Sequence, residues 1–324
     1  MTSWRDQLEF DPIQSLILSK NIALVYHTKR TLLDEKVPPI ESLWELNPAL
    51  KIIKKQNANG SWAYRGGKEI IRSRENYNQL ETYRQLGFLI ENFGFNNTHP
   101  SIKKAAQFLF SFQTDLGDFR GIYGTQYTPN YSAGICELLI KAGYYADVRI
   151  KKCLEWLLAS RQNDGGWAIP IRTQNYKWQE VVNSDKILEP RTEKPFSHII
   201  TGVVLRAFAA HPYYRKSEEI RQAALLLLDN FFQNDNYPDR KEKSFWTKFT
   251  FPFWFTDLLS ALDSIYFIAI AKHHPNILKS LEWFKKQQQP DGMWDVKILK
   301  TGVDKDIKLW IGYLICLTFK RFLA

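Results

Sequence analysis

The sequence predicts an all-α protein of about five to six helix pairs, and three observations carry this prediction. A short phrase of Gln, Gly and an aromatic residue recurs along the chain. An amphipathic segment with helical periodicity precedes each copy, and a more apolar segment follows it. Because each apolar helix needs cover on both sides, a closed ring with the apolar helices inside satisfies the pattern. An open solenoid of helix pairs satisfies the same local pattern.

The recurring phrase is clearest in "RQNDGGW" at 161–167 and "QPDGMW" at 289–294. We take its defining residues as Gln162 with Trp167 and Gln289 with Trp294. The weaker copies are Gln56 with Trp62, Gln113 with Phe119, and Gln233 with Tyr237. We expect each Gln to hydrogen-bond exposed backbone at helix ends, while the aromatic residue stacks on it and covers the start of the next helix. The phrase is therefore structural.

The predicted helices alternate between amphipathic and apolar members. Residues 11–33 supply an early helical segment. The predicted outer helices are 41–56, 99–113, 147–162, 217–233 and 274–289. The predicted inner helices are 77–94, 131–145, 197–211, 255–272 and 308–323. Asp or His-Pro marks the starts of amphipathic members. We therefore expect one domain over 1–324, with an N-terminal helical segment at 1–39 and five helix-pair repeats at 40–324.

The composition is that of a globular protein with an excess of aromatic residues. Aromatics make up 15% of the 324 residues, and the formal net charge is +10. No long basic run or RNA-binding signature appears, so we expect no nucleic-acid partner. Three isolated cysteines indicate a reducing compartment. The polar N-terminus and the lack of a long apolar run predict a cytoplasmic protein, either free or held peripherally on the inner membrane surface.

The recurring phrase resembles the QW repeat of squalene and oxidosqualene cyclases and related terpene cyclases. That resemblance covers nearly the whole chain through the repeats. It implies an α/α toroid, the double ring of inner and outer helices that these cyclases share with the β subunits of protein prenyltransferases. The length suits a single toroid. The implied ligand is an isoprenoid or another apolar small molecule in a central apolar cavity.

The sequence departs from the chemistry of those families. Class II cyclases protonate their substrate with the middle Asp of an Asp-x-Asp-Asp motif, which is missing here. The nearest approach is Asp304 with Asp306, for which helix capping is the simpler interpretation. No Cys has the acidic neighbour two residues earlier that prenyltransferases use to hold zinc. We therefore predict no metal and no other cofactor, with Mg²⁺ only if the substrate is a diphosphate.

The candidate catalytic residues lie in or at the starts of the apolar helices. Asp257 follows Trp254 and Phe255, and an acid among aromatic rings resembles a site that forms carbocations. It is equally compatible with a helix N-terminal charge. The other candidates are His198, Glu81 and Glu137. A helix cap explains His198 equally well, and pairing with neighbouring Lys or Arg explains the two glutamates.

Two long connections are expected to cap the cavity, because long loops in compact folds are commonly lids or binding elements. Residues 168–195 contain Tyr176 and Trp178, which join Trp254 and Phe255 as candidates for binding an isoprenoid tail. Residues 235–255 contain Arg240, Lys241 and Lys243, the candidates for binding a diphosphate.

Three functions stay open at this point. The first is a squalene/terpene cyclase-like or prenyltransferase-like protein with a non-standard acid, and whether it is catalytic is undecided. The second is a non-catalytic toroid that binds a lipid or isoprenoid. The third is a carbohydrate-active α/α-barrel lyase or hydrolase. A deep aromatic pocket with one buried acid favours the first, a pocket without acids the second, and a polar groove with two carboxylates the third.

Overall fold

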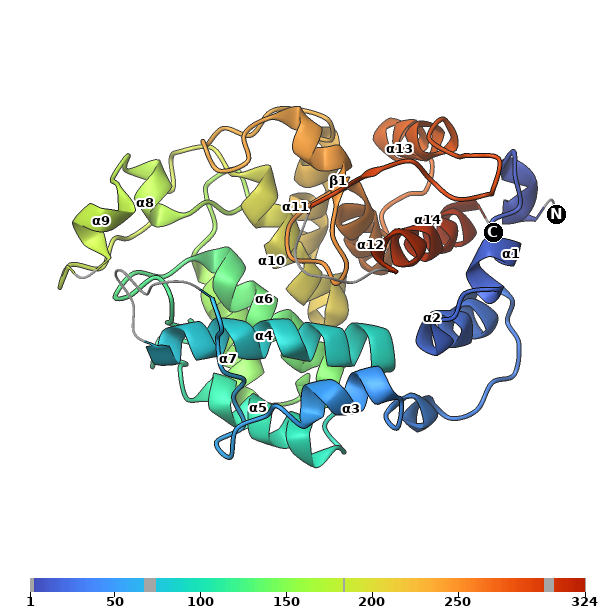
Figure 1. Cartoon of the computed structure of the whole chain (residues 1–324). Helices are drawn as coiled ribbons and strands as arrows, with labels where there is room; N and C mark the ends of the chain where they lie inside the picture. The colour runs from blue at the N-terminus through green and yellow to red at the C-terminus, as the bar shows by residue number, and fades with distance from the viewer. Residues whose placement is uncertain (1–2, 67–73, 183, 300–305, 324) are drawn as a thin grey trace.

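The computed structural model describes residues 3–66, 74–182, 184–299 and 306–323, which form a closed double ring of helices (Figure 1). The inner ring consists of α2 (Ile22–His27), α4 (Arg74–Phe93), α6 (Pro129–Leu139), α10 (His198–Ala210), α12 (Leu258–Ile268) and α14 (Ile307–Leu323). Each inner helix contacts the next one, and α14 returns to contact α2. The toroid is thus confirmed, and the open solenoid is excluded.

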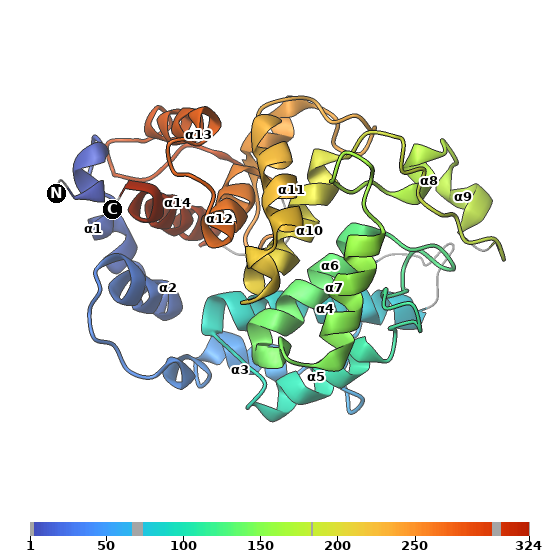
Figure 2. The ribbon, with the colours of Figure 1, turned by 180° about the vertical axis from the view of Figure 1, so that it is seen from behind.

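The outer layer covers these helices, as the reverse view shows for α7 and α11 (Figure 2). Its members are α1 (Ile13–Ile17), α3 (Asn47–Ile53), α5 (Pro100–Phe110), α7 (Val148–Ala159), α11 (Glu218–Asp229) and α13 (Pro275–Lys285). The predicted caps are confirmed, because the side chains of His99, Asp147 and His274 accept backbone N–H groups at the starts of α5, α7 and α13. The N-terminal segment contributes α1 and α2, which complete a sixth helix pair.

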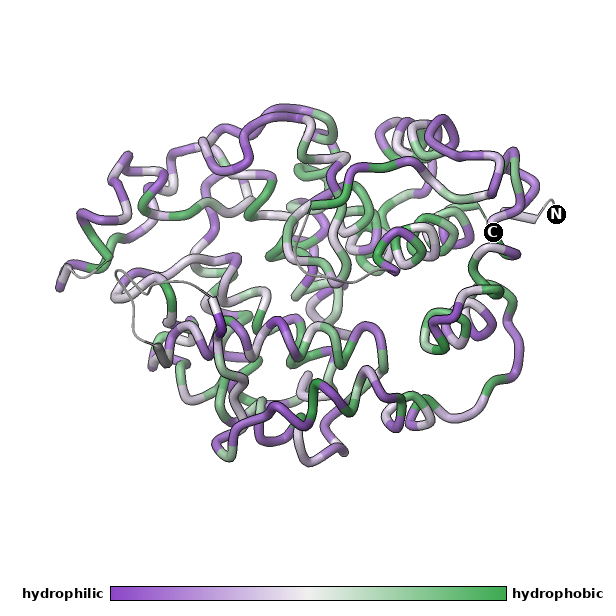
Figure 3. The backbone as a smooth tube through the Cα atoms, in the orientation of Figure 1, coloured by the Kyte–Doolittle hydropathy of each residue, from purple (hydrophilic) through white to green (hydrophobic). Residues whose placement is uncertain are grey.

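The inner helices are apolar over most of their circumference. Nearly every residue of α10 is buried, whereas α13 buries only one face. Hydrophobic residues accordingly concentrate where α10 and α12 meet near the centre of the molecule (Figure 3). This difference follows from position, because an inner helix is covered by its two neighbours and by the outer layer.

The remaining elements are short. The 3₁₀ and π turns are η1 (Trp4–Gln7), η2 (Thr28–Leu32), η3 (Ile40–Leu43), η4 (Ile140–Tyr144), η5 (Tyr214–Lys216) and η6 (Lys243–Thr247). Strands β1 (Lys248–Phe249) and β2 (Lys297–Ile298) pair in parallel. Helices α8 (Pro170–Thr173) and α9 (Trp178–Val181) belong to the long connection at 168–195, which projects from one side of the ring (Figure 1).

The recurring Gln residues join successive helix pairs. The amide of Gln56 donates to the carbonyl of Ser101 in the first turn of α5 at 2.8 Å. Gln113 likewise donates to Arg149 at the start of α7, also at 2.8 Å. These bonds satisfy carbonyl groups between neighbouring repeats, as the sequence predicts.

The tryptophans of the phrase make a further contact that the sequence analysis did not predict. The indole N–H groups of Trp62, Trp167 and Trp294 donate to Ile52, Leu157 and Phe284 at 2.7 to 3.0 Å. Each acceptor lies in the outer helix that precedes the turn. The indole therefore adds a second donor to a carbonyl near the end of the preceding outer helix, and that carbonyl also accepts a backbone N–H from the turn.

Two assignments within the phrase need correction. In the last copy the bridging residue is Gln288, one position before Gln289, because its side chain reaches the backbone of Phe10. In the fourth copy Tyr237 does not take the aromatic place; its hydroxyl donates to Pro195, while Trp246 donates to Gln233 after α11. Neighbouring glutamines and a long loop after Gln233 hide these shifts from sequence reasoning.

Gln288 closes the ring between the last turn and the N-terminal segment. Its amide donates to the Phe10 carbonyl at 2.8 Å, and its carbonyl accepts from the Glu9 and Phe10 amides at 3.2 Å. We expect Gln288→Ala to lower the free energy of unfolding by about 2 kcal/mol, because it leaves these backbone groups without partners.

Urea denaturation of the variant measures this loss, and Gln289→Ala is the matched control. Gln289 is exposed, so its replacement is expected to change stability by less than about 0.5 kcal/mol. Equal effects of the two replacements would contradict the assignment of Gln288 as the closing residue.

In the described parts of the chain, none of the helices combines the length and the apolar character needed to cross a bilayer.

Candidate functional site

A cavity of about 440 Å³ opens toward the N-terminal ends of the inner helices. Its apolar wall combines aromatic and aliphatic side chains from α4, α6, α10 and the segments before α6 and α12. The described lining residues are Leu80, Tyr83, Arg84, Ile122, Tyr123, Asn130, Tyr131, Val203, Arg240, Trp254, Phe255 and Leu299. None of them is a carboxylate.

Trp254 and Phe255 line this cavity, as predicted from the sequence. The indole of Trp254 contacts Tyr83 edge-on, with 5.2 Å between ring centres, and lies 6.1 Å from Phe88. It also lies so close to Gly87 that a Cβ there would stand 2.5 Å from the indole. A glycine in the middle of α4 therefore lets the indole pack against the helix backbone.

Arg240, Arg84 and Asn130 form the polar part of the lining. The guanidinium carbon of Arg240 lies 3.4 Å from the centre of the Phe255 ring, a cation–π contact. Burial lowers the pKa of Arg240, but a guanidinium stays charged at neutral pH. Arg84 is about half exposed and lies 3.7 Å from Glu81. Asn130 stands in the first turn of α6, where the helix dipole favours negative charge.

The connection at 168–195 fastens two of the segments that carry lining residues, the one before α6 and the one before α12. Gln126 reaches into it, because its amide donates to the carbonyls of Val181 and Lys186 at 2.9 Å. Arg172 of α8 pairs with Asp239, the neighbour of Arg240, at 2.7 Å. The connection thus braces the cavity from outside. It does not line the cavity in the part of the chain that the structure describes.

Asp257 caps α12 directly behind the aromatic wall. Its Oδ1 accepts from the amide of Ser260 at 2.8 Å, and the residue is 1% exposed. Its Oδ2 makes no hydrogen bond to the described residues. Burial raises the pKa of Asp257 to about 7, against opposing effects of Ser260, Arg206 and the Thr250 backbone. A carboxyl that holds its proton near neutral pH is able to act as an acid, although Asp257 is not among the lining residues.

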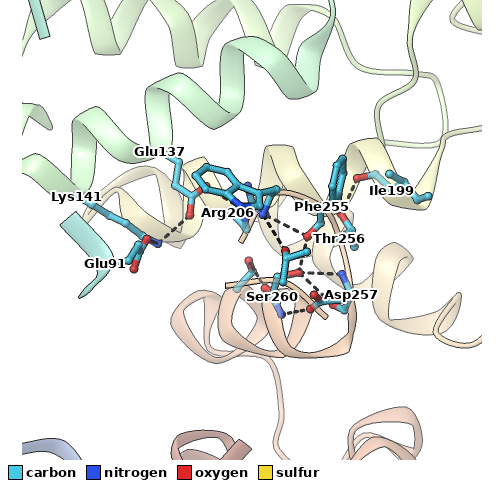
Figure 4. A network of polar contacts seen from close by, with 12 residues as sticks. Glu91, Glu137, Lys141, Ile199, Arg206, Phe255, Thr256, Asp257 and Ser260 are labelled. Carbon is cyan, nitrogen blue, oxygen red and sulfur yellow. Dashed lines mark hydrogen bonds and ion pairs between the residues drawn. The ribbon is translucent and has the colours of Figure 1, made fainter. Parts of the chain in front are cut away.

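A chain of charges lies behind this wall, with Arg206 and Glu137 buried and Lys141 and Glu91 partly buried (Figure 4). Arg206 donates to Glu137 at 2.9 Å, and Lys141 donates to Glu137 at 2.8 Å and to Glu91 at 2.6 Å. Arg206 also donates to the carbonyl of Phe255 at 3.3 Å. The network therefore ties α4, α6 and α10 to the segment that carries the cavity's aromatic residues.

Charge pairing sets the protonation of this network. Burial alone would lower the pKa of Lys141, but Glu137 and Glu91 raise it well above its usual value. Burial raises the pKa of Tyr83 to about 12, so its hydroxyl stays neutral and able to donate. Glu137 is thus held in ion pairs, and it lines a smaller cavity of about 180 Å³ toward the other ends of the inner helices.

The other predicted catalytic residues lie away from the central cavity. His198 is buried and stacks on Trp246, with 4.7 Å between ring centres and its Nε2 3.5 Å from Asp235. Burial lowers the pKa of His198. Glu81 accepts from Gln85 at 2.6 Å and lines a separate hollow on the outer side of α4. The cap of α10 is Ser197 and not His198, whereas Glu81 lies 3.7 Å from Arg84, as its simpler interpretation expects.

The predicted binding residues separate in the same way. Arg240 lines the cavity, whereas Lys241 is exposed and Lys243 faces an outer groove, so the three do not form one site. Tyr176 is 40% exposed and does not line the cavity. Trp178 does not line it either, but its ring lies 4.8 Å from that of Tyr123, a lining residue. Trp178 therefore supports the wall from behind.

Several residues of the site were not predicted. Tyr83 and Arg84 share one face of α4 with Leu80 and Gly87, and a helical spacing of three and four residues was the available signal. Arg206 interrupts the apolar stretch "GVVLRAFAA", and a lone charge on a buried helix signals an internal partner. Tyr123, Asn130 and Leu299 have no comparable sequence signal.

Within the described residues, no three His, Cys, Asp or Glu side chains come together in a way that would hold a metal ion. Asp306 accepts from the side chain of Asn21 at 2.9 Å, and Asp304 lies outside the described residues.

Comparisons with known proteins relate the chain to terpenoid cyclases. Residues 81–193 match the family model of the squalene-hopene cyclase C-terminal domain. A squalene–hopene cyclase from Zymomonas mobilis is 30% identical over 74 residues, which are 23% of this chain and only 11% of that relative. Both matches support the terpenoid cyclase-like superfamily that the repeat indicates, over part of the chain.

Several solved structures are similar to the chain at low sequence identity. An apo type II terpene cyclase from Scytonema is 12% identical with a TM-score of 0.43, and the match covers 88% of this chain and 82% of that one. The same enzyme in complex with its substrate geranylgeranyl dihydroxybenzoate is 11% identical with a TM-score of 0.42, and the match covers 87% of this chain and 84% of that one. A protein from Actinoplanes is 14% identical with a TM-score of 0.41, and the match covers 88% of each chain.

Proposed function

We propose that this chain binds an isoprenoid with an anionic head inside the central cavity. The character of the cavity lining carries the proposal: aromatic and aliphatic walls, two guanidinium groups, and no carboxylate among the described lining residues. Ligand pockets are commonly apolar with a few placed polar groups. The volume of about 440 Å³ lies within the usual range of such pockets.

The walls suit an unsaturated hydrocarbon chain. Each methylene group that leaves water contributes about 0.8 kcal/mol. Tyr83, Tyr131 and Trp254 offer the tail ring faces and edges, and Val203 and Leu299 add aliphatic contact. A tail that enters this cavity therefore gains most of its binding free energy from burial.

The cations suit a phosphate, diphosphate or carboxylate head. Arg240 is partly buried against Phe255, so its charge acts where water is scarce. Arg84 stands at the same cavity, and its partner Glu81 at 3.7 Å is too distant for a strong ion pair. If the head is a diphosphate, Mg²⁺ would accompany it, because this ion is usually bound through substrate phosphates.

A catalytic role is the second candidate, and Asp257 is the observation that favours it. A protonated carboxyl behind Phe255 could transfer a proton to an alkene if the ligand or the wall moved to meet it. The aromatic faces of the wall would then stabilise a cation. A carbohydrate-active site is disfavoured, because the described lining lacks the two facing carboxylates on which glycoside hydrolysis depends.

Binding of farnesyl diphosphate tests the proposal. We expect Arg240→Gln to weaken the affinity for farnesyl diphosphate about tenfold, because a hydrogen bond to a charged group contributes about 1.5 to 3 kcal/mol. Binding of farnesol, which has no anionic head, is expected to change little. Lys241→Gln is the matched control, because this exposed neighbour removes the same charge outside the cavity.

Isothermal titration calorimetry measures these affinities, and mass spectrometry of the extracted mixtures shows whether the ligand is changed. A cyclised product that disappears in Asp257→Asn would support the catalytic candidate, and unchanged farnesyl diphosphate would support binding alone. Equal losses in the two charge variants, or no saturable binding by the original protein, would contradict the proposed function.

A further inference from the structure

A further hollow lies on the outer surface, apart from the central cavity. This outer groove of about 640 Å³ runs between α13 and the segment 232–247. It shares no lining residue with the central cavity. The groove belongs to the outer layer, so the proposed isoprenoid site does not account for it.

The charge of the outer groove is positive. Lys243, Lys279 and Lys286 line it, and none of them pairs with a carboxylate in the described part of the chain. Its single acidic lining residue, Glu282, is paired with Lys285 at 2.9 Å. Three ammonium groups therefore face one hollow without a compensating charge. Such an arrangement raises the local concentration of anions.

The floor of the outer groove is aromatic and held in place by packing. Trp283 contacts Phe284 and Phe249, with ring centres 5.2 and 6.0 Å apart. The ammonium of Lys279 stands 4.7 Å from the centre of the Phe232 ring. This cation–π contact fixes one of the three charges beside the floor. The hydroxyl groups of Ser244 and Thr247 also line the groove.

We propose that the outer groove binds a phosphate-bearing anion. Lysine ammonium groups recognise phosphate as point charges, and each supplies three donors. The aromatic floor accepts an apolar group next to the phosphate. Two sources share this chemistry, a soluble phosphate compound and the head group of an anionic lipid. Lys243 therefore belongs to the outer groove, whereas Arg240 belongs to the central cavity.

The test uses two probes and a variant that disables the central cavity. Inorganic pyrophosphate is titrated by calorimetry, and vesicles of phosphatidylcholine with or without phosphatidylglycerol are tested by co-sedimentation. All proteins carry Arg84→Gln and Arg240→Gln, so binding in the central cavity does not contribute. Failure of the proposed isoprenoid site therefore leaves this test unaffected.

In that background we expect Lys243→Ala/Lys279→Ala/Lys286→Ala to weaken binding at least about tenfold. The matched control is Lys103→Ala/Lys104→Ala/Lys152→Ala, which removes three exposed charges on α5 and α7 and is expected to change affinity less than about twofold. All six lysines are exposed, so both triple variants are expected to fold, which circular dichroism checks.

Each outcome has one meaning. Loss of pyrophosphate binding in the groove variant identifies a soluble phosphate compound as the source. Loss confined to vesicles with phosphatidylglycerol identifies a lipid head group. Equal binding by the groove and control variants, or no binding of either probe by the parent, would overturn the proposal.

Discussion

Replacing Asp257 with Asn is expected to stabilise the folded protein at pH 8 by up to about 4 kcal/mol. The carboxyl is 1% exposed, and burial raises its pKa to about 7 from the usual 3.8. A shift of one pKa unit corresponds to about 1.4 kcal/mol. Asn keeps the acceptor for the Ser260 amide and carries no charge, so it avoids the cost of a buried carboxylate.

The sign of the pH dependence follows from this shift. Between pH 3.8 and about 7 the folded protein holds a proton on Asp257 that the unfolded chain has lost. The stabilisation from this proton is therefore complete below pH 3.8 and is lost as the pH rises through 7. The stability of the original protein should fall relative to Asp257→Asn across this range and level off above it.

Urea denaturation of both proteins at several pH values measures the difference between their free energies of unfolding. Because the two proteins share all other titrating groups, the effects of those groups cancel in this difference. Asp295→Asn is the control, because it makes the same chemical change at an exposed position. A constant difference between Asp257→Asn and the original protein from pH 4 to 8 would contradict a raised pKa. Asp257 would then lose its place as the candidate acid.

Replacing Arg206 with Met is expected to lower the free energy of unfolding by about 3 to 5 kcal/mol. The side chains of Arg206 and Glu137 are only 2% and 4% exposed, so removal of one partner leaves the other charge buried. The change also removes the hydrogen bond to the Phe255 carbonyl. Isoprenoid affinity should fall as well, because this bond positions a wall of the cavity.

Two further variants serve as controls for this prediction. Arg221→Met removes an exposed arginine whose partner Glu218 is 3.7 Å away, and it should cost less than about 0.5 kcal/mol. Glu137→Gln/Arg206→Met removes both charges, leaves Lys141 with Glu91, and should lose less stability than Arg206→Met alone. A loss below about 1 kcal/mol in Arg206→Met would show that the network does not support the ring.

Local signals in the sequence were sufficient to predict the helix pairs, and the resemblance of the phrase to the QW repeat implied the ring. Helical periodicity, His-Pro caps and the recurring Gln-Gly-Trp phrase all depend on contacts within one or two neighbouring repeats. These signals left closure open, because an open solenoid of helix pairs satisfies the same local pattern. The bond from Gln288 to Phe10 depends on contact between the first and last helix pairs, which no local signal shows.

The site was predicted only where residues lie close together along the chain. Trp254, Phe255 and Asp257 belong to one short segment, so an acid near aromatic rings was visible in the sequence. Arg240 and Lys243 are also close in sequence, but within the connection 235–255 their side chains line different hollows. The spacing of residues in a long loop does not show which way their side chains point.

The most direct test of the central claim is photolabelling with a farnesyl diphosphate analogue that carries a diazirine on its tail. Mass spectrometry then maps the labelled residues. We predict saturable labelling on Tyr83, Tyr123 or Trp254, and competition by farnesyl diphosphate. Labelling spread over the outer helices, or labelling that excess farnesyl diphosphate does not reduce, would contradict a closed ring that holds an isoprenoid at its centre.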